Sequence, residues 1–379
     1  MKCINCSKES NLISKFLGIC LDCIRNDFQK VRPHLEEVHQ QSRKKFNLPA
    51  KPPKDEKGVK CKICTNECLI PEGERGYCGL RKNVDGKLVH LAGTAEKGIL
   101  DWYYDPLPTN CVAEWVCSGG RVPPHSGYKN LAVFYRACTF NCLFCQNWHF
   151  RQTRIDTNIR TNSRESFIRG HSCLSAEELV RLWRIDEKTY CVCYFGGDPT
   201  PQIGHALATS RIILRKKNIL PQKRVRICWE TNGSMNQGLL KEVALVTYES
   251  GGCIKFDLKT YDENLNLALC GVSNRRTLEN FAYLNEWIKD KSRPNEGEPF
   301  LIASTLLVPG YIDTEEVYKI AKFIAQLNSE IPYSLLAFYP QFFMPDLPVT
   351  SRKQAEECYE AAKRAGLKNI NLGNVHLLL

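Results

Sequence analysis

The chain has 379 residues, of which 43% are hydrophobic and 25% charged, a composition that excludes global disorder and indicates a folded globular protein. It contains no run of roughly 18 apolar residues and no basic-then-apolar start, so we expect no membrane span, no secretory signal and a cytoplasmic location. The net charge of +11 suits acidic partners. The 20 cysteines indicate metal binding rather than disulfides in a reducing compartment.

The first feature along the chain is a four-cysteine pattern, C-x2-C-x13-C-x2-C, formed by Cys3, Cys6, Cys20 and Cys23. Two tight pairs on two turns are what a tetrahedral four-thiolate site needs, so residues 1–27 are predicted to form a zinc-ribbon-like module. The alternative is four free thiols. Residues 28–60 are predicted to be a helical, basic linker, solvated from Arg43 onward. A nucleic-acid contact there is less favoured, because no aromatic ladder accompanies the charge.

A second group follows in a predicted module spanning residues 61–128. Its cysteines are Cys61, Cys64, Cys68 and Cys78, in the pattern C-x2-C-x3-C-x9-C. Zinc and an iron–sulfur cluster both use four thiolates, so spacing alone does not choose between them.

The third group has three cysteines on one loop, Cys138, Cys142 and Cys145, directly after the strand-like run 131–136. Three thiolates would hold three irons of a 4Fe–4S cluster and leave the fourth iron open to another ligand. The remaining cysteines lie mostly in apolar surroundings and are predicted to be small core residues: Cys111, Cys117, Cys173, Cys191, Cys193, Cys228, Cys253, Cys270 and Cys358.

Strand-like and helical patterns alternate over residues 129–379. Strands are predicted at 131–136, 190–195, 225–230, 254–258, 301–308, 333–339 and 370–372. Helical periodicity is present at 174–183, 236–245, 276–288, 314–327 and 352–367. This alternation predicts an α/β fold with a parallel sheet and with chemistry at the carboxyl ends of its strands.

Polar motifs stand at three of those strand ends. Gly196, Gly197 and Asp198 follow the second strand, and Asn232 follows the third. Asp257 and Lys259 end the fourth, and their spacing places a carboxylate and an ammonium on one face. Each motif alone is equally compatible with a polar strand end in solvent.

Together with the loop CTFNCLFCQNW, these motifs resemble the radical S-adenosylmethionine (AdoMet) superfamily, most closely its pyruvate formate-lyase-activating enzyme-like and AmmeMemoRadiSam-system members. GVSNRRTLENF and TLLVPGYID resemble the activating enzymes, and the likeness covers about residues 60–379. It implies a partial (β/α)6-type barrel with AdoMet bound across the strand ends.

The resemblance also implies roles for single residues. Cys138, Cys142 and Cys145 would hold the cluster, whose fourth iron AdoMet completes. Phe144 would pack near the adenine, and Gly196, Gly197 and Asp198 would take the amino end. Asp257 and Asn232 would take the ribose, and Lys259 the carboxylate. Two residues depart from the family pattern: Asp198 stands where the family has Glu, and Tyr339 stands where activating enzymes have a His, so the role of Tyr339 stays open. The role of His149, just after the cluster loop, stays open as well.

The expected function is reductive cleavage of AdoMet to a 5′-deoxyadenosyl radical, which takes hydrogen from a protein or a small-molecule substrate. The electron donor would be flavodoxin or ferredoxin. The alternative is a zinc-containing protein that binds or modifies nucleic acid, which leaves the strand-end motifs without a purpose.

Overall fold

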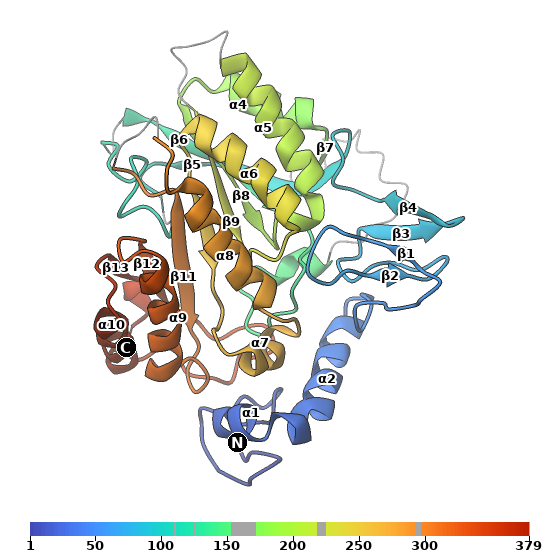
Figure 1. Cartoon of the computed structure of the whole chain (residues 1–379), viewed down its shortest axis with the longest axis vertical. Helices are drawn as coiled ribbons and strands as arrows, with labels where there is room; N and C mark the ends of the chain where they lie inside the picture. The colour runs from blue at the N-terminus through green and yellow to red at the C-terminus, as the bar shows by residue number, and fades with distance from the viewer. Residues whose placement is uncertain (110, 124–125, 153–171, 218–224, 293–296, 379) are drawn as a thin grey trace.

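The computed structural model describes residues 1–109, 111–123, 126–152, 172–217, 225–292 and 297–378 (Figure 1). Within these ranges nine strands form one sheet, in the order β13-β12-β11-β10-β9-β8-β6-β5-β7. Seven of these described strands are parallel: β6 (Lys129–Tyr135), β8 (Thr189–Gly196), β9 (Arg226–Thr231), β10 (Ile254–Asp257), β11 (Leu301–Leu307), β12 (Tyr333–Ala337) and β13 (Ile370–Gly373). They are the seven strands that the sequence predicts, so the α/β fold class is confirmed.

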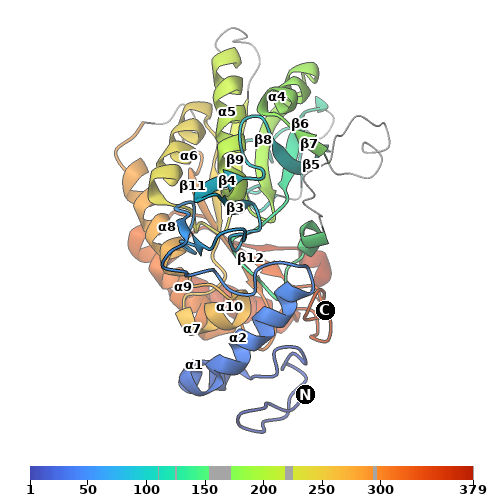
Figure 2. The same cartoon turned by 90° about the vertical axis from the view of Figure 1, so that its right-hand side faces the viewer.

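Two antiparallel strands extend the sheet beyond β6. Strand β5 (Gly98–Pro106) pairs with β6, and β7 (Ser172–Leu174) pairs with β5. The parallel strands need long crossover connections, and helices supply them. They are α4 (Ala176–Ile185), α5 (Ile203–Lys217), α6 (Gln237–Ser250), α7 (Glu263–Cys270), α8 (Arg275–Ile288), α9 (Thr314–Leu327) and α10 (Arg352–Arg364). Helices α4, α5, α6, α8 and α9 form a layer outside the sheet (Figures 1 and 2).

The sequence predicts α4, α6, α8, α9 and α10 but neither α5 nor α7. Helix α5 carries His205, Thr209 and Ser210 on its buried side, where they are fully buried. The His205 ring bonds the Tyr135 hydroxyl at 2.7 Å, and Ser210 donates to Tyr194 at 3.1 Å. Because these core residues are polar, the segment lacks the hydrophobic periodicity from which a helix is predicted. Helix α7 has only eight residues, too few to show a period.

The core between the sheet and the helices is built on large aromatic side chains. Trp183, Tyr194 and Trp229 are fully buried, and the rings of Tyr194 and Trp229 lie 4.6 Å apart. Even the indole of Trp229 has a partner, because its Nε1 donates to Thr247 at 2.8 Å. The satisfied donor lets the largest side chain enter the core without the cost of an unpaired polar group.

The N-terminal residues pack beside α7 on the partial barrel that the parallel strands and their helices form (Figure 2). Helices α1 (Leu21–Asn26) and α2 (Phe28–Lys44) form this part. Arg25 binds the Asp313 carboxylate through two nitrogens, each at 2.8 Å, and the Ser14 amide donates to the Tyr311 hydroxyl at 3.0 Å. These contacts attach the first cysteine group to the loop before α9.

The expected solvated linker is wrong at its start. Arg43 is 1% exposed, and its guanidinium lies over the Tyr77 ring at 3.4 Å. The same guanidinium donates to the carbonyls of Tyr77 and Pro49. The basic run therefore begins inside the protein, because carbonyl oxygens and an aromatic face compensate the buried charge.

The second cysteine group lies among short strands. Strand β1 (Val59–Lys60) pairs antiparallel with β2 (Leu69–Ile70), and β3 (Arg81–Val84) with β4 (Lys87–His90). Cys61, Cys64 and Cys68 are buried and Cys78 is half-buried. The division of the chain after residues 27, 60 and 128 stays a prediction.

The contact between α1 and the barrel leads to a test. Arg25→Ala should lower the free energy of unfolding by about 1–3 kcal/mol, because it removes a bidentate charged hydrogen bond and leaves Asp313 without that partner. Arg32→Ala is the matched control, since its ion pair with Glu36 is exposed and should contribute less than about 1 kcal/mol. Thermal unfolding of both variants measures the difference, and equal stabilities would show that the docking contact contributes little.

Candidate active site

The loop after β6 carries Cys138, Cys142 and Cys145 and is fixed at both sides of Cys142. The amide of Asn141 donates to the Cys270 carbonyl at 2.8 Å, and that of Leu143 to the Leu269 carbonyl at 3.0 Å. The loop is thus tied to the end of α7. Helix α2 supports it as well, because the Asn141 side chain donates to His39 Nδ1 at 2.7 Å while His39 Nε2 donates to the Ala268 carbonyl at 3.0 Å.

A cavity of about 560 Å³ lies between this loop and the carboxyl ends of the parallel strands. Its volume falls in the range of pockets that take small ligands, roughly 300–1,000 Å³. All ten residues that the sequence predicts for the cluster and for AdoMet line it: Cys138, Cys142, Phe144, Cys145, Gly196, Gly197, Asp198, Asn232, Asp257 and Lys259. The structure therefore brings together residues spread over 122 positions of the chain, from 138 to 259.

The two glycines after β8 are required by the chain itself. Gly196 has φ +112°, a conformation that strains other residues, and a Cβ on Gly197 would lie 2.2 Å from the Ala137 carbonyl oxygen. The amide of Gly197 donates to Tyr135 and that of Asp198 to Ala137, at 3.0 and 2.9 Å. This close approach holds the GGD segment against the start of the cluster loop.

Asp198 is buried and joins the ends of β8 and β9. Its carboxylate accepts from the amides of Thr200 and Asn232 at 2.8 and 2.7 Å and from the Thr231 hydroxyl at 3.0 Å. Burial raises the pKa of this carboxyl, and the hydrogen bonds oppose that rise. A contact of Asp198 with the amino end of AdoMet stays a prediction.

The Asn232 side chain faces the loop. Its Nδ2 lies 2.8 Å from Thr139 Oγ1 and 3.7 Å from Cys138 Sγ, while its Oδ1 accepts from the Ser234 amide at 3.0 Å. Asn232 therefore positions Cys138 in this structure, and its predicted ribose contact stays a prediction.

Asp257 and Lys259 form an ion pair at the end of β10. Burial lowers the pKa of the Lys259 ammonium, but the adjacent Asp257 carboxylate outweighs it, so the pKa is raised and the side chain is charged at neutral pH. Its Nζ also lies 5.7 Å from the centre of the Phe144 ring. The structure thus joins three of the predicted ligand contacts in one cluster of side chains.

The three loop thiols suit a multi-iron ligand. Burial raises the pKa of Cys138 well above the usual thiol value and that of Cys145 to about 11, so both need a cation to ionise. Among the described residues, these three sulfurs do not all lie within 4.8 Å of one another, as the ligands of a single ion would. A wider spacing is expected when each thiolate binds a different iron.

The sequence misses other residues that line this cavity, among them Glu230, Lys255 and His376. Lys255 is 2% exposed and forms a 2.9 Å ion pair with Glu230. Alternation along the strand, two residues before Asp257, is a signal that points to Lys255. His376 comes from the C-terminal turn η4 (Val375–Leu377), and no local pattern indicates its position.

Two residues with open roles are placed away from the cavity lining. Tyr339 is 53% exposed, and His149 is exposed with its ring stacked on Trp148 at 4.0 Å. Neither lines the 560 Å³ cavity.

The Cys61–Cys78 group lies directly against the cluster loop. The Thr65 amide donates to the Ser234 carbonyl at 2.8 Å, and Asn66 Nδ2 to the Thr139 carbonyl at 2.8 Å. The four cysteines surround one small cavity. Whether this group binds zinc or an iron–sulfur cluster stays open, since both use four thiolates.

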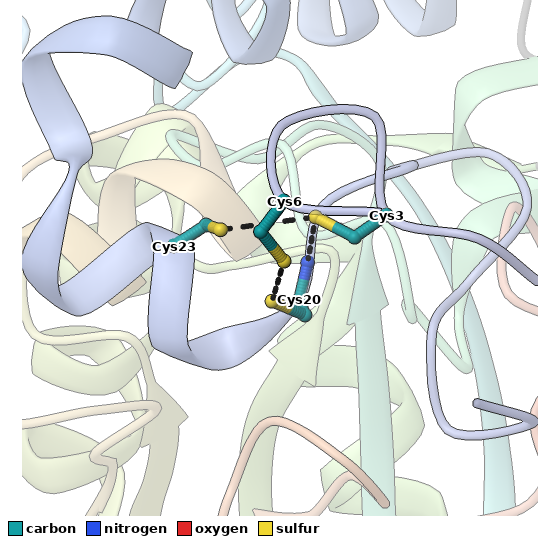
Figure 3. Close-up of side chains that lie close together, drawn as sticks. All are labelled: Cys3, Cys6, Cys20 and Cys23. Atoms are coloured by element: carbon teal, nitrogen blue, oxygen red, sulfur yellow. Dashed lines mark hydrogen bonds between the residues drawn. The ribbon is translucent and has the colours of Figure 1, made fainter. Parts of the chain in front are cut away.

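The first cysteine group has the geometry of a single-ion site. The sulfurs of Cys3, Cys6, Cys20 and Cys23 all lie within 4.8 Å of one another, with Cys3–Cys23 at 3.8 Å and Cys6–Cys20 at 3.7 Å (Figure 3). Four ligands at a Zn–S distance of ~2.3 Å in a tetrahedron give nearly this separation. Burial raises the pKa of Cys3, but backbone amides lower it to about 6, which favours the thiolate.

Comparisons with known proteins identify a family and similar sequences. The family model of the Radical SAM superfamily matches residues 132–324. An uncharacterized protein of Methanocaldococcus jannaschii is 26% identical over 85% of this chain and 83% of its own length. The pyruvate formate-lyase 1-activating enzyme of Escherichia coli is 23% identical over 55% of this chain and 73% of its own.

Among solved structures, SuiB of Streptococcus suis bound to the precursor peptide SuiA is 17% identical, with a TM-score of 0.44. The match covers 63% of this chain and 47% of SuiB. Within the described residues, no helix is long and apolar enough to cross a membrane.

The geometry of the first cysteine group gives a prediction. The chain should carry one tightly bound zinc that Cys6→Ser with Cys20→Ser removes, because two thiolates alone do not complete the tetrahedron. Metal analysis of the purified protein measures this loss as about one zinc per chain, a single four-thiolate site. Cys173→Ser with Cys358→Ser is the matched control and should keep the zinc. Full zinc content in the Cys6 and Cys20 variant would contradict the assignment.

Proposed function

This chain belongs to the radical SAM superfamily, and we propose that it abstracts a hydrogen atom from a protein substrate, in the manner of an activating enzyme. Membership makes it an enzyme with a 4Fe–4S cluster and AdoMet as cofactors. When bound and reduced by one electron, AdoMet supplies methionine and the 5′-deoxyadenosyl radical. The name of the Escherichia coli relative, an activating enzyme of pyruvate formate-lyase, supports a protein as the substrate.

The observation that carries the proposal is the shared cavity of the cluster loop and the strand ends. Three thiols stand on one side, and Asp198, Asp257 and Lys259 stand around them with both charge signs. AdoMet also carries both signs, on its amino and carboxylate groups, so the lining is complementary to it. Cys270 lies 3.4 Å from Cys142 but does not line the cavity, so it acts as a neighbouring thiol rather than as a cluster ligand.

The proposed roles of the chain's residues follow from where they lie. Cys138, Cys142 and Cys145 hold three irons, and Asn232 orients the first of these thiolates. Lys259 binds the carboxylate of AdoMet and Asp257 the ribose, and the ion pair between them holds both side chains in place before AdoMet arrives. Because the pair is already formed, little side-chain entropy is lost on binding.

The remaining contacts concern the adenine and the amino end. Phe144 is buried beside Lys259 and packs near the adenine, while the backbone of Gly196 and Gly197 takes the amino end next to Asp198.

An external electron must reach the cluster, and we infer that flavodoxin or ferredoxin delivers it at a basic cavity of about 840 Å³. Cys78 and Cys138 both line this cavity, so it adjoins two cysteine groups. The basic side chains of this lining that solvent reaches suit an acidic carrier protein: Lys44, Lys45 and Arg75.

The cluster assignment has a direct test. Changing Cys138, Cys142 and Cys145 together to Ala should abolish 5′-deoxyadenosine formation from AdoMet and dithionite under anaerobic conditions, because no ligand remains for the three irons. The zinc content should not change. Chromatography of the product measures the effect, with Cys173→Ala as control. Undiminished AdoMet cleavage in the triple variant would overturn the assignment.

The role of Lys259 gives a second test. Lys259→Ala should weaken AdoMet binding by ~1.5–3 kcal/mol, the loss of one charge-assisted hydrogen bond, which is roughly ten- to a hundred-fold in affinity. Cluster absorbance should survive, because no iron ligand is changed. Lys289→Ala, an exposed lysine on the outer surface, should leave affinity unchanged. Normal affinity together with a lower melting temperature would make Lys259 only the partner of Asp257.

The substrate class can be read from the product. We expect deuterium in 5′-deoxyadenosine when the enzyme, AdoMet and reductant are incubated with the protein fraction of cells grown on deuterated medium. The triple cysteine variant is the control. Deuterium transfer from the small-molecule fraction alone would reject the protein substrate while retaining radical chemistry.

A further inference from the structure

Six cysteines that the proposed mechanism does not use line one cavity of about 100 Å³ inside the barrel. Four lie on the strands or next to one: Cys191 and Cys193 on β8, Cys228 on β9 and Cys253 just before β10. The other two, Cys111 and Cys117, lie on the loop that follows β5. The sequence predicts these residues as small core side chains. The strand cysteines are indeed buried, but they gather around a space instead of filling it.

The strand register explains why they meet. Cys193 pairs with Cys228 across β8 and β9, and Lys255 of β10 pairs with Glu230 of β9. Cys228 and Cys253 stand two residues before Glu230 and Lys255, so they face the same interior one level lower. The cysteines thus form a layer directly beneath the Glu230–Lys255 pair, which also lines the AdoMet cavity.

The loop after β5 closes this layer. Trp115 Nε1 donates to Ser334 Oγ on β12 at 3.0 Å, and Ser334 Oγ donates to the Val112 carbonyl at 2.9 Å. These bonds attach the loop after β5 to β12. They hold Cys111 and Cys117 over the strand cysteines.

Buried cations face the thiols. The Lys255 ammonium donates to Cys111 Sγ at 3.1 Å and to Cys193 Sγ at 3.2 Å. Arg226, 4% exposed at its side chain, lines the same cavity and is paired with Glu298 at 2.6 Å. N–H donors aimed at sulfur stabilise thiolates, the form in which cysteine binds metals.

The spacing fits a polynuclear ligand better than one ion. Cys228 and Cys253 have sulfurs 3.8 Å apart, close enough to share a metal. In the described part of the chain, no three of the six sulfurs all lie within 4.8 Å of one another. The cavity holds several times the ~10–15 Å³ that one water needs, so it has room for bridging atoms between the metals.

We propose that the six-cysteine cavity binds an iron–sulfur cluster, separate from the cluster of the Cys138 loop. Four of the six thiolates, with Cys193 and Cys228 among them, ligate its irons, and inorganic sulfide bridges the irons. Binding of this cluster does not depend on the substrate of the enzyme. Lys255 would lie between a cluster bound here and the AdoMet cavity, because it lines both cavities.

The test removes the site in a chain that already lacks the first cluster. The background is the triple variant Cys138→Ala, Cys142→Ala and Cys145→Ala, reconstituted with iron and sulfide without oxygen. Adding Cys193→Ala and Cys228→Ala should remove about two or four irons and as many acid-labile sulfides per chain, one 2Fe–2S or 4Fe–4S cluster. The Cys61–Cys78 group is present in both chains, so its content cancels in the difference.

The control adds Cys173→Ala and Cys358→Ala to the same background and should keep the iron. Equal iron and sulfide with and without the Cys193 and Cys228 changes, in folded protein, would overturn the proposal. Loss of zinc instead of iron would do the same. If that variant does not fold, iron-edge anomalous diffraction from the unmodified reconstituted protein decides. A peak among the six sulfurs is expected, and iron peaks only at other cysteine groups would reject the site.

Discussion

Side-chain alternation on parallel strands that curve around one interior is the constraint from which both cavities follow. On β9 and β10, residues two apart place Cys228 and Cys253, then Glu230 and Lys255, at successive levels of the same interior. The opposite phase carries Ile227, Trp229, Ile254 and Phe256, all fully buried against the helices. A slip of one residue would exchange the two sets, so the apolar face fixes the register that orients the polar one.

The interior that results is polar, and its buried cations are paired. Lys255 with Glu230, Lys259 with Asp257 and Arg226 with Glu298 each join a cation to a carboxylate. An unpaired charge at such depth would cost several kcal/mol. Burial also raises the pKa of the loop thiols, so the metal that deprotonates them stabilises the loop as well. The interior is therefore suited to charged ligands, namely the 4Fe–4S cluster and the zwitterionic AdoMet.

The seven parallel strands could be predicted from β-branched runs. The cavity residues are indicated by the spacing of the three loop cysteines, by polar residues at the strand ends and, for Phe144, by the resemblance to the radical AdoMet superfamily, and their ligand contacts stay predictions. Residues whose place is set by distant parts of the chain could not be predicted. His376 enters from the C-terminal turn, and Cys111 from a loop anchored to Ser334 more than two hundred residues later. Arg43 reads as part of a solvated basic run because its partners, carbonyl oxygens and the Tyr77 ring, leave no mark in composition.

The two N-terminal cysteine groups bear on the site through the loop they support. The Cys61–Cys78 group bonds Thr139 through Asn66, and α2 bonds Asn141 through His39, so both neighbours of the Cys138 and Cys142 thiols are held from outside the barrel. Burial lowers the pKa of His39 to about 4, so its ring is neutral and Nδ1 accepts the Asn141 hydrogen bond at physiological pH. Small metal-dependent modules fold with their metal. Metal bound to the N-terminal groups would therefore be linked to the conformation of the loop that carries the cluster, because whatever binds only the folded module stabilises every contact that the module makes.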